Sequence, residues 1–178
     1  MKQKKCLQDA MRNHFLRVQK VKIQERKQAM IAKSKKIIHV ASGLAGTAGT
    51  SPIPFSDMPL IAGVQTWMIY EMNDAFEVSL GKSAAPTFIT GILGVTAIGQ
   101  GARAFVNMIK FVPGVGSVAG SATAVIITEG IGFAYLKVLE KCFNDETGEV
   151  NLPDEVGMIT SLFKENYLNL DTIKKLKP

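Results

Sequence analysis

The sequence Ser-Pro-Ile-Pro-Phe-Ser-Asp-Met-Pro-Leu, residues 51–60, predicts a sharp break between two helices. Pro52 and Pro54 end any preceding helix, because proline lacks an amide hydrogen and fixes φ. Ser56 can cap a following helix, and Asp57 favours the positive end of the helix dipole. We therefore predict that a helix begins near residue 57.

A second, looser break lies at residues 111–117, Phe-Val-Pro-Gly-Val-Gly-Ser. The two breaks divide a nearly uncharged stretch, residues 37–139, into helical segments that are either packed or membrane-facing. Residues 84–102 carry no charge and four glycines, which favour close helix contact. No segment alternates as a strand would, so the predicted fold is all-α.

The helix predicted from residue 57 carries apolar residues at a spacing of three to four. Leu60, Trp67 and Ile69 widen its apolar face, which predicts a largely enclosed helix. We place the polar end of this helix at Glu71, Asn73, Asp74 and Glu77, and its C-terminal stop at Gly81.

The N-terminal segment is basic and free of proline and glycine through residue 36. It is predicted to form one long helix that runs on to Gly46 or Gly49. Residues 1–36 hold 12 of the 21 Lys and Arg against Asp9 and Glu25, a net charge of +10, while the rest of the chain carries −4. This asymmetry suggests an acidic partner, namely anionic lipid, nucleic acid or an acidic protein face, or else a solvated connecting helix.

Two sparse apolar stripes run along this helix. One follows an i, i+4 pattern: Leu7, Met11, Phe15 and Val18. The other recurs every seven residues: Leu16, Ile23, Met30, Ile37 and Leu44. With one apolar position per heptad, the seam is too narrow to form a stable coiled coil by itself. We interpret the helix as lying along a partner surface or as a lever that leaves another domain.

At 178 residues, with 47% hydrophobic residues, the chain suits one structural unit with a sizeable core. We divide it into a basic helical arm (1–36), an apolar, glycine-rich helical bundle (37–143) and a charged C-terminal tail with short helices (144–178). Within the tail, residues 144–148 have the composition of a surface turn, and Pro153 opens a short amphipathic helix.

Two short motifs imitate nucleotide-binding loops. Gly81-Lys82-Ser83 resembles the end of a phosphate-binding loop, but Phe76 stands where the first glycine is required. Residues 114–119 imitate the dinucleotide fingerprint, but Pro113 precedes them in place of a strand. Both are better explained by a helix stop followed by a helix start.

No catalytic or metal constellation can be assembled from the sequence, so we expect no enzyme activity, no cofactor and no metal. His14 lies in the basic arm and His39 is expected to be packed within a helix. Cys6 and Cys142 are far apart and fit a reducing cytoplasm. Arg103 and Glu129 stand nearly alone among apolar residues; they would pair if both were buried, and the favoured alternative is that each lies on an exposed helix face.

These residues resemble a family, the helical domain of unknown function that follows the G domain in bacterial Era-like GTPases of the YcjF-related type. The resemblance runs over about residues 7–142. It rests on Phe15, Gln19-Lys20-Val21, Lys35-Lys-Ile-Ile38, Pro52-Ile-Pro-Phe-Ser-Asp57, Gln65, Met68-Ile69, Arg103 and Pro113-Gly114-Val-Gly116.

The resemblance implies a helical module that works with a GTPase, in cis or in trans, since the chain itself has no G domain. Its family-motif positions would be Pro52, Pro54, Phe55, Asp57, Gln65, Arg103, Pro113, Gly114 and Gly116. We expect a cytoplasmic, membrane-associated protein.

The favoured hypothesis is a non-enzymatic interaction module at an anionic membrane surface. Its predicted contact residues are Lys20, Lys22, Arg26, Lys27, Lys33, Lys35 and Lys36. One alternative is a membrane-inserted hairpin of residues 84–102 and 117–136, which Glu129 would disfavour by about 2.5 to 3.5 kcal/mol at mid-depth. Another alternative is nucleic-acid binding through the arm. Phe15 is the single aromatic residue there, so the arm is poorly suited to recognise bases by stacking. A homo-oligomer is compatible with all three.

Overall fold

A computed structural model describes residues 2–48, 58–78, 89–92, 94, 120–153 and 155–167. The fold is all-α, as predicted. Its labelled helices are α1 (Lys2–Ala48), α2 (Met58–Ala75), α5 (Gly120–Cys142) and α6 (Val156–Tyr167). Within the described residues, the β-type pairing is confined to a bridge between Phe143 and Val150.

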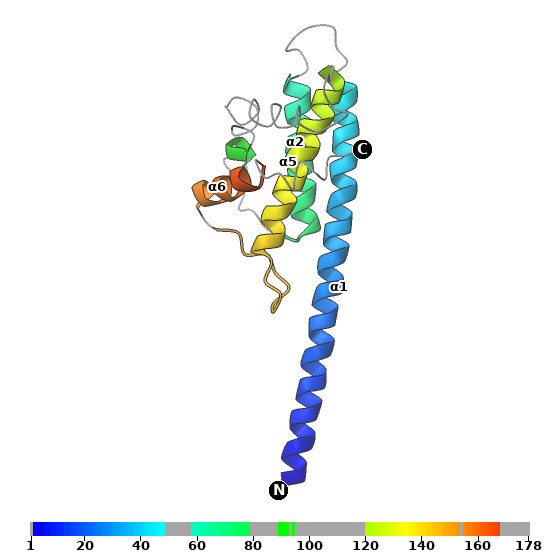
Figure 1. Ribbon diagram of the computed structural model, residues 1–178, viewed down its shortest axis with the longest axis vertical. Helices are drawn as coiled ribbons and strands as arrows, with labels where there is room; N and C mark the ends of the chain where they lie inside the picture. Colours follow the sequence, from blue (N-terminus) through cyan, green and yellow to red (C-terminus); the bar gives the residue numbers. More distant parts are fainter. Residues whose placement is uncertain are drawn as a thin grey trace, which may run out of the picture.

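Helix α1 runs the whole length of the molecule, and only its C-terminal half lies against the body (Figure 1). Helices α2 and α5 pack beside that half and against each other, while α6 packs on α5. The predicted end of α1 at Gly46 or Gly49 and the predicted start of α2 near residue 57 are confirmed by the observed bounds.

The buried stripe of α1 begins with Met30 and continues through Ser34, Ile38, Ala41 and Ala45. Ile23, Met30 and Ile37 of the predicted seven-residue seam do face the body. Leu44 was predicted on the same seam but is 48% exposed. A strict seven-residue repeat drifts by about 20° per heptad on a straight helix, so it leaves the buried face over this distance.

Helix α5 packs closely against both α1 and α2 at Gly132. A Cβ at this position would lie 2.6 Å from Ile38 Cγ1 of α1 and 3.1 Å from Met68 Sδ of α2. Ile38 and Met68 are both fully buried. An added Cβ would therefore clash with Ile38 and lie tightly against Met68, so glycine at this position permits the close packing of α5 on both helices.

Two buried polar pairs join α2 to α5 on either side of this contact. Gln65 Nε2 donates to Thr128 Oγ1 at 3.2 Å, and the Tyr135 hydroxyl donates to Asn73 Oδ1. Burial raises the pKa of Tyr135, so its hydroxyl stays protonated and remains a donor. The pairs fix the register of the two helices, because a shift would leave buried polar atoms without partners.

Three features of α2 differ from the sequence-based predictions. Asn73 was predicted to be at a solvated end, but it is buried and bonded to Tyr135. The predicted enclosure is wrong for Leu60 and Trp67, which are 62% and 39% exposed. The predicted stop at Gly81 is also wrong, because α2 ends at Ala75.

The early end of α2 has a local cause. Glu77 adopts φ 55°, its amide donates to Asp74 O, and the Val78 amide donates to Asn73 O. This is the hydrogen-bond pattern of a Schellman motif, which closes a helix without glycine when other contacts hold the left-handed residue. Arg26 of α1 supplies such a contact through an ion pair with the Glu77 carboxylate.

The C-terminal elements agree with the sequence. Asn144 Oδ1 accepts hydrogen bonds from the amides of Glu146 and Thr147, which forms the predicted surface turn. Gly148 closes this turn at φ 78°. Helix α6 buries Ile159 and Phe163 against the core, as its amphipathic pattern indicated.

We predict that Gly132→Ala lowers the free energy of unfolding. Overpacking in a core costs about 1–3 kcal/mol, and better helix propensity returns about 1 kcal/mol of it. The net loss should therefore reach up to about 2 kcal/mol in chemical denaturation.

The matched control is Gly63→Ala on the exposed face of α2, where an added Cβ would have no neighbour within 4 Å. This variant should be neutral or more stable, by about 1 kcal/mol at most. Equal effects of the two substitutions would contradict the role assigned to Gly132.

Candidate functional site

The N-terminal half of α1 extends away from the packed body of the molecule. Every residue from 8 to 22 is exposed. Isolated helices of this length are marginal in water, and this one is stabilised by its continuity with the packed half of α1 (Figure 1). Residues 8–22 are the exposed part of the arm predicted at residues 1–36, and we restrict the name arm to them.

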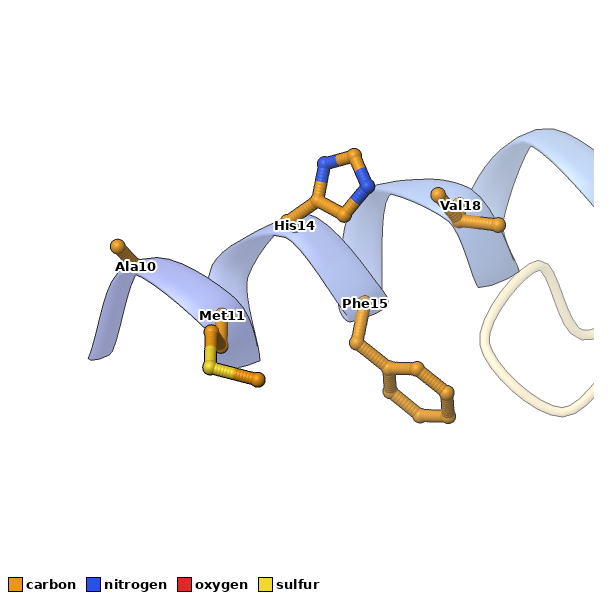
Figure 2. A pocket seen from close by; sticks show the side chains of 5 residues that line it. All are labelled: Ala10, Met11, His14, Phe15 and Val18. Atoms are coloured by element: carbon orange, nitrogen blue, oxygen red, sulfur yellow. The ribbon is translucent and has the colours of Figure 1, made fainter. Parts of the chain in front are cut away.

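The large apolar side chains of the arm are exposed to solvent. Met11 and Phe15 are 65% and 61% exposed, and Val18 is 40% exposed. With Ala10 and His14 these side chains line a shallow hollow along one side of the helix (Figure 2). The predicted i, i+4 stripe faces solvent at Met11, Phe15 and Val18, while the side chain of Leu7 lies outside the described part of the structure.

The seven cationic residues predicted as contact residues divide into two groups. Lys20, Lys22, Lys35 and Lys36 are exposed, and among the described residues no acid pairs with them. The remaining three hold α1 to the body: Arg26 pairs with Glu77, Lys27 with Asp145 at 2.8 Å, and Lys33 with Asp74 at 3.3 Å.

The contacts thus begin inside the range predicted as arm. Ile23 is half-buried against the core, and Lys27 keeps only 17% of its side chain exposed. The Lys27 ammonium also lies 4.8 Å from the centre of the Phe143 ring. The turn of residues 143–150 therefore contacts α1 at the point where this helix leaves the body. We call this turn the collar.

The collar perturbs one titratable group. Hydrogen bonds from Lys27 and Gln24 hold the pKa of the Asp145 carboxyl below its ordinary value of 3.8. Gly148 lies beside Ile23 and Arg26 in the same collar. These pairs leave no local signal in the sequence, because the partners are about 50 to 120 residues apart.

A second polar contact joins α1 to α5. His39 Nδ1 lies 3.0 Å from Glu129 Oε1, and its ring meets Phe133 edge-on. The prediction that His39 is packed was wrong, since 60% of its side chain is exposed. Glu129 is the more buried partner at 19% exposure, and Arg103 lies outside the described residues.

Of the family-motif positions, the structure describes the side chain of Gln65 alone, in its buried bond to Thr128. The others lie outside the described residues: Pro52, Pro54, Phe55, Asp57, Arg103, Pro113, Gly114 and Gly116. The two loop-like motifs, residues 81–83 and 114–119, lie outside them as well.

Over the described parts of the chain, no group of three His, Cys, Asp or Glu residues is placed to hold a metal ion. Cys142 is a free thiol at the end of α5, and burial raises its pKa. A raised pKa keeps a thiol protonated and unreactive.

Comparison with known proteins gives one distant similarity. The chain is 26% identical over 112 residues to magnetosome membrane protein 22 of Magnetospirillum gryphiswaldense. The match covers 61% of this chain and 56% of that protein, so the chain spans little more than half of the relative's length. No protein-family model matches the chain, and no solved structure matches it significantly.

None of the helices in the described ranges combines the length and the apolar character needed to cross a bilayer. Most of residues 84–102, the first segment of the predicted hairpin, lies outside those ranges.

We predict that Asp145→Asn destabilises the chain at neutral pH but not in acid. Since the pKa of Asp145 is lower in the folded than in the unfolded chain, its ion pair stabilises the fold above pH 3.8. That contribution is lost as the pH falls through the lowered pKa.

Denaturant midpoints of the wild type and the variant should therefore differ at pH 7 and converge below pH 3.8. Glu146→Gln, at an exposed neighbour in the same turn, is the control and should leave the midpoint unchanged. A difference between Asp145→Asn and wild type that persists at low pH would contradict the assignment.

Proposed function

We propose that this chain is a non-enzymatic helical interaction module that binds an anionic membrane surface through the arm of α1 and works together with a GTPase. The observation that carries the proposal is the arm itself, fifteen residues of exposed helix on which Met11, Phe15 and Val18 are uncovered. Beside them Lys20 and Lys22 have no acidic partner in the part of the chain that the structure describes. Such a combination of apolar and basic residues suits the boundary between lipid headgroups and acyl chains.

Charge supports an anionic surface in particular. The described arm holds Arg12, Arg17, Lys20 and Lys22 against a single acid, Asp9. Each basic residue near an anionic membrane contributes about 1 kcal/mol. The acids of the body are partly matched by Arg26, Lys27 and Lys33. The cations of the arm, and Lys35 and Lys36 farther along α1, have no acidic partner among the described residues.

The distant similarity points in the same direction. The relative is by name a membrane protein of the magnetosome. The shared region supports membrane association for this chain at a coarse level, and the anionic lipid requirement is our own addition.

The GTPase connection rests on the family resemblance of the sequence. A helix that is packed at one end and free at the other can act as a lever, since a partner bound to the arm can transmit a movement to the core through α1. The arm would then connect a nucleotide-switching domain to the helical body. We propose no catalytic role for the chain itself.

The test of membrane binding is sedimentation with liposomes. Wild-type protein should bind vesicles that contain phosphatidylserine and should not bind purely zwitterionic vesicles. The double variant Lys20→Gln/Lys22→Gln should lose about 2 kcal/mol of binding free energy, or roughly thirtyfold in affinity.

The matched control is Lys141→Gln/Lys164→Gln. Both residues are exposed, on α5 and α6, and this variant loses the same net charge. It should bind like the wild type. Equal loss in the two double variants would show a net-charge effect, and binding that ignores lipid charge would remove the arm from the mechanism.

The GTPase proposal needs a separate experiment. A photo-crosslinking amino acid at Arg17, on the exposed arm, should capture a protein that contains a G domain when introduced in the native cell. Capture should depend on whether GTP or GDP is bound. If the captured proteins contain no G domain, the GTPase partnership fails while the lipid measurements stand.

A further inference from the structure

The exposed apolar residues of this molecule are concentrated on two helices. Of eleven large hydrophobic side chains that the described residues expose, ten belong to α1 or α2, and the other is Met158 of α6. None belongs to α5, which buries its apolar side chains between its neighbours. The surface formed by α1 and α2 therefore differs in kind from the rest of the body.

On α1 four of the seven exposed apolar residues share one face with three lysines and an alanine, while Leu16, Val21 and Leu44 fall outside it. At 100° per residue, the eight positions of this face fall within about 60° of one another and extend over about 44 Å. All eight are exposed. They are Met11, Phe15, Val18, Lys22, Ala29, Lys33, Lys36 and Val40. Along the packed half the face is mainly basic, and it becomes apolar again at Val40.

On α2 the exposed face carries Leu60, Trp67 and Tyr70, and Asp74 lies in the same line. Asp74 reaches across to Lys33 on the exposed face of α1 at 3.3 Å. The exposed faces of the two helices therefore adjoin. Because α1 and α2 run antiparallel (Figure 1), this pair sets Trp67 about level with Val40.

The charge of this combined surface is positive. Its acids Asp74 and Glu77 are matched by Lys33 and Arg26. Lys22 and Lys36 remain without an acidic partner in the described structure, against Glu25 at the edge. Two such surfaces repel each other, so a second copy of the chain is a poor occupant, whereas an anionic bilayer is complementary.

Trp67 and Tyr70 add a chemical preference to the charge. Tryptophan and tyrosine have an apolar body and a polar edge, and they concentrate at membrane–water interfaces. Trp67 is 39% exposed and Tyr70 is 44% exposed, so each is anchored by the helix yet open on one side.

We infer that the whole α1–α2 face lies flat on an anionic membrane, with Trp67 and Tyr70 at headgroup level and α6 directed away from the lipid. This inference rests on the proposed membrane function and deepens it, because the arm alone could bind while the body stays in solution. Flat binding places Trp67 in the interface.

Trp67 is the single tryptophan of the chain, so intrinsic fluorescence reports on this face directly. On adding vesicles of phosphatidylcholine and phosphatidylserine to the full-length protein, we expect its emission to shift to the blue. Vesicles with brominated acyl chains should quench it. Sedimentation of the same samples measures binding independently.

The control moves the reporter to the opposite side. Met158 on α6 is 55% exposed, and the double variant Trp67→Phe/Met158→Trp places the single tryptophan there. This variant should sediment with the vesicles as the wild type does, with no blue shift and no quenching.

The outcomes separate the two proposals. Failure to sediment with acidic vesicles would refute the membrane function itself. Sedimentation with unchanged Trp67 emission, or with an equal response from the tryptophan at position 158, would overturn the flat orientation alone. A blue shift that follows protein concentration without lipid would show that a second copy covers the face, which also overturns it.

Discussion

The absence of a side chain at Gly132 is the constraint on which this architecture depends. It lets α5 approach Ile38 of α1 at a distance that a Cβ would not allow, and Met68 of α2 at a distance that would be tight for one. Because interiors are close-packed, this contact sets the position of α1 along its own axis. The length of α1 that remains outside the body follows from that position.

Electrostatics then decides which part of the long basic helix is free. Arg26, Lys27 and Lys33 are used by acids from α2, the turn after it and the 143–150 collar. Exposed ion pairs of this kind contribute little stability each. Their larger effect is to match the body's acids locally, which leaves the unpaired lysines and the apolar stripe as a distinct cationic surface.

The sequence predicts the features that depend on local chemistry. The end of α1 and the start of α2 follow from the proline cluster at residues 52–59, and the 144–148 turn follows from its own residues. Asn73 and Trp67 could not be placed, because their burial depends on Tyr135 and on the side of α2 that α5 covers. The end of α2 at Ala75 was missed because its left-handed cap is a glutamate.

The sequence predicts where the candidate site lies, but not which basic residues belong to it. Net charge and the i, i+4 stripe point to the arm, which the structure leaves exposed. No sequence pattern separates Lys20 from Lys27, whose ion partner lies 118 residues away. The contribution of α2 to an exposed face also depends on tertiary packing, which sets the pairing of Lys33 with Asp74.

Hydrogen exchange resolved along α1 tests the central claim most directly, since one helix is held by the body over half its length only. Amides of residues 34–45 should exchange slowly, near the limit set by global unfolding, while those of residues 8–22 should exchange quickly in the free protein. Equal protection along the whole helix would contradict the account, and so would fast exchange around Ile38.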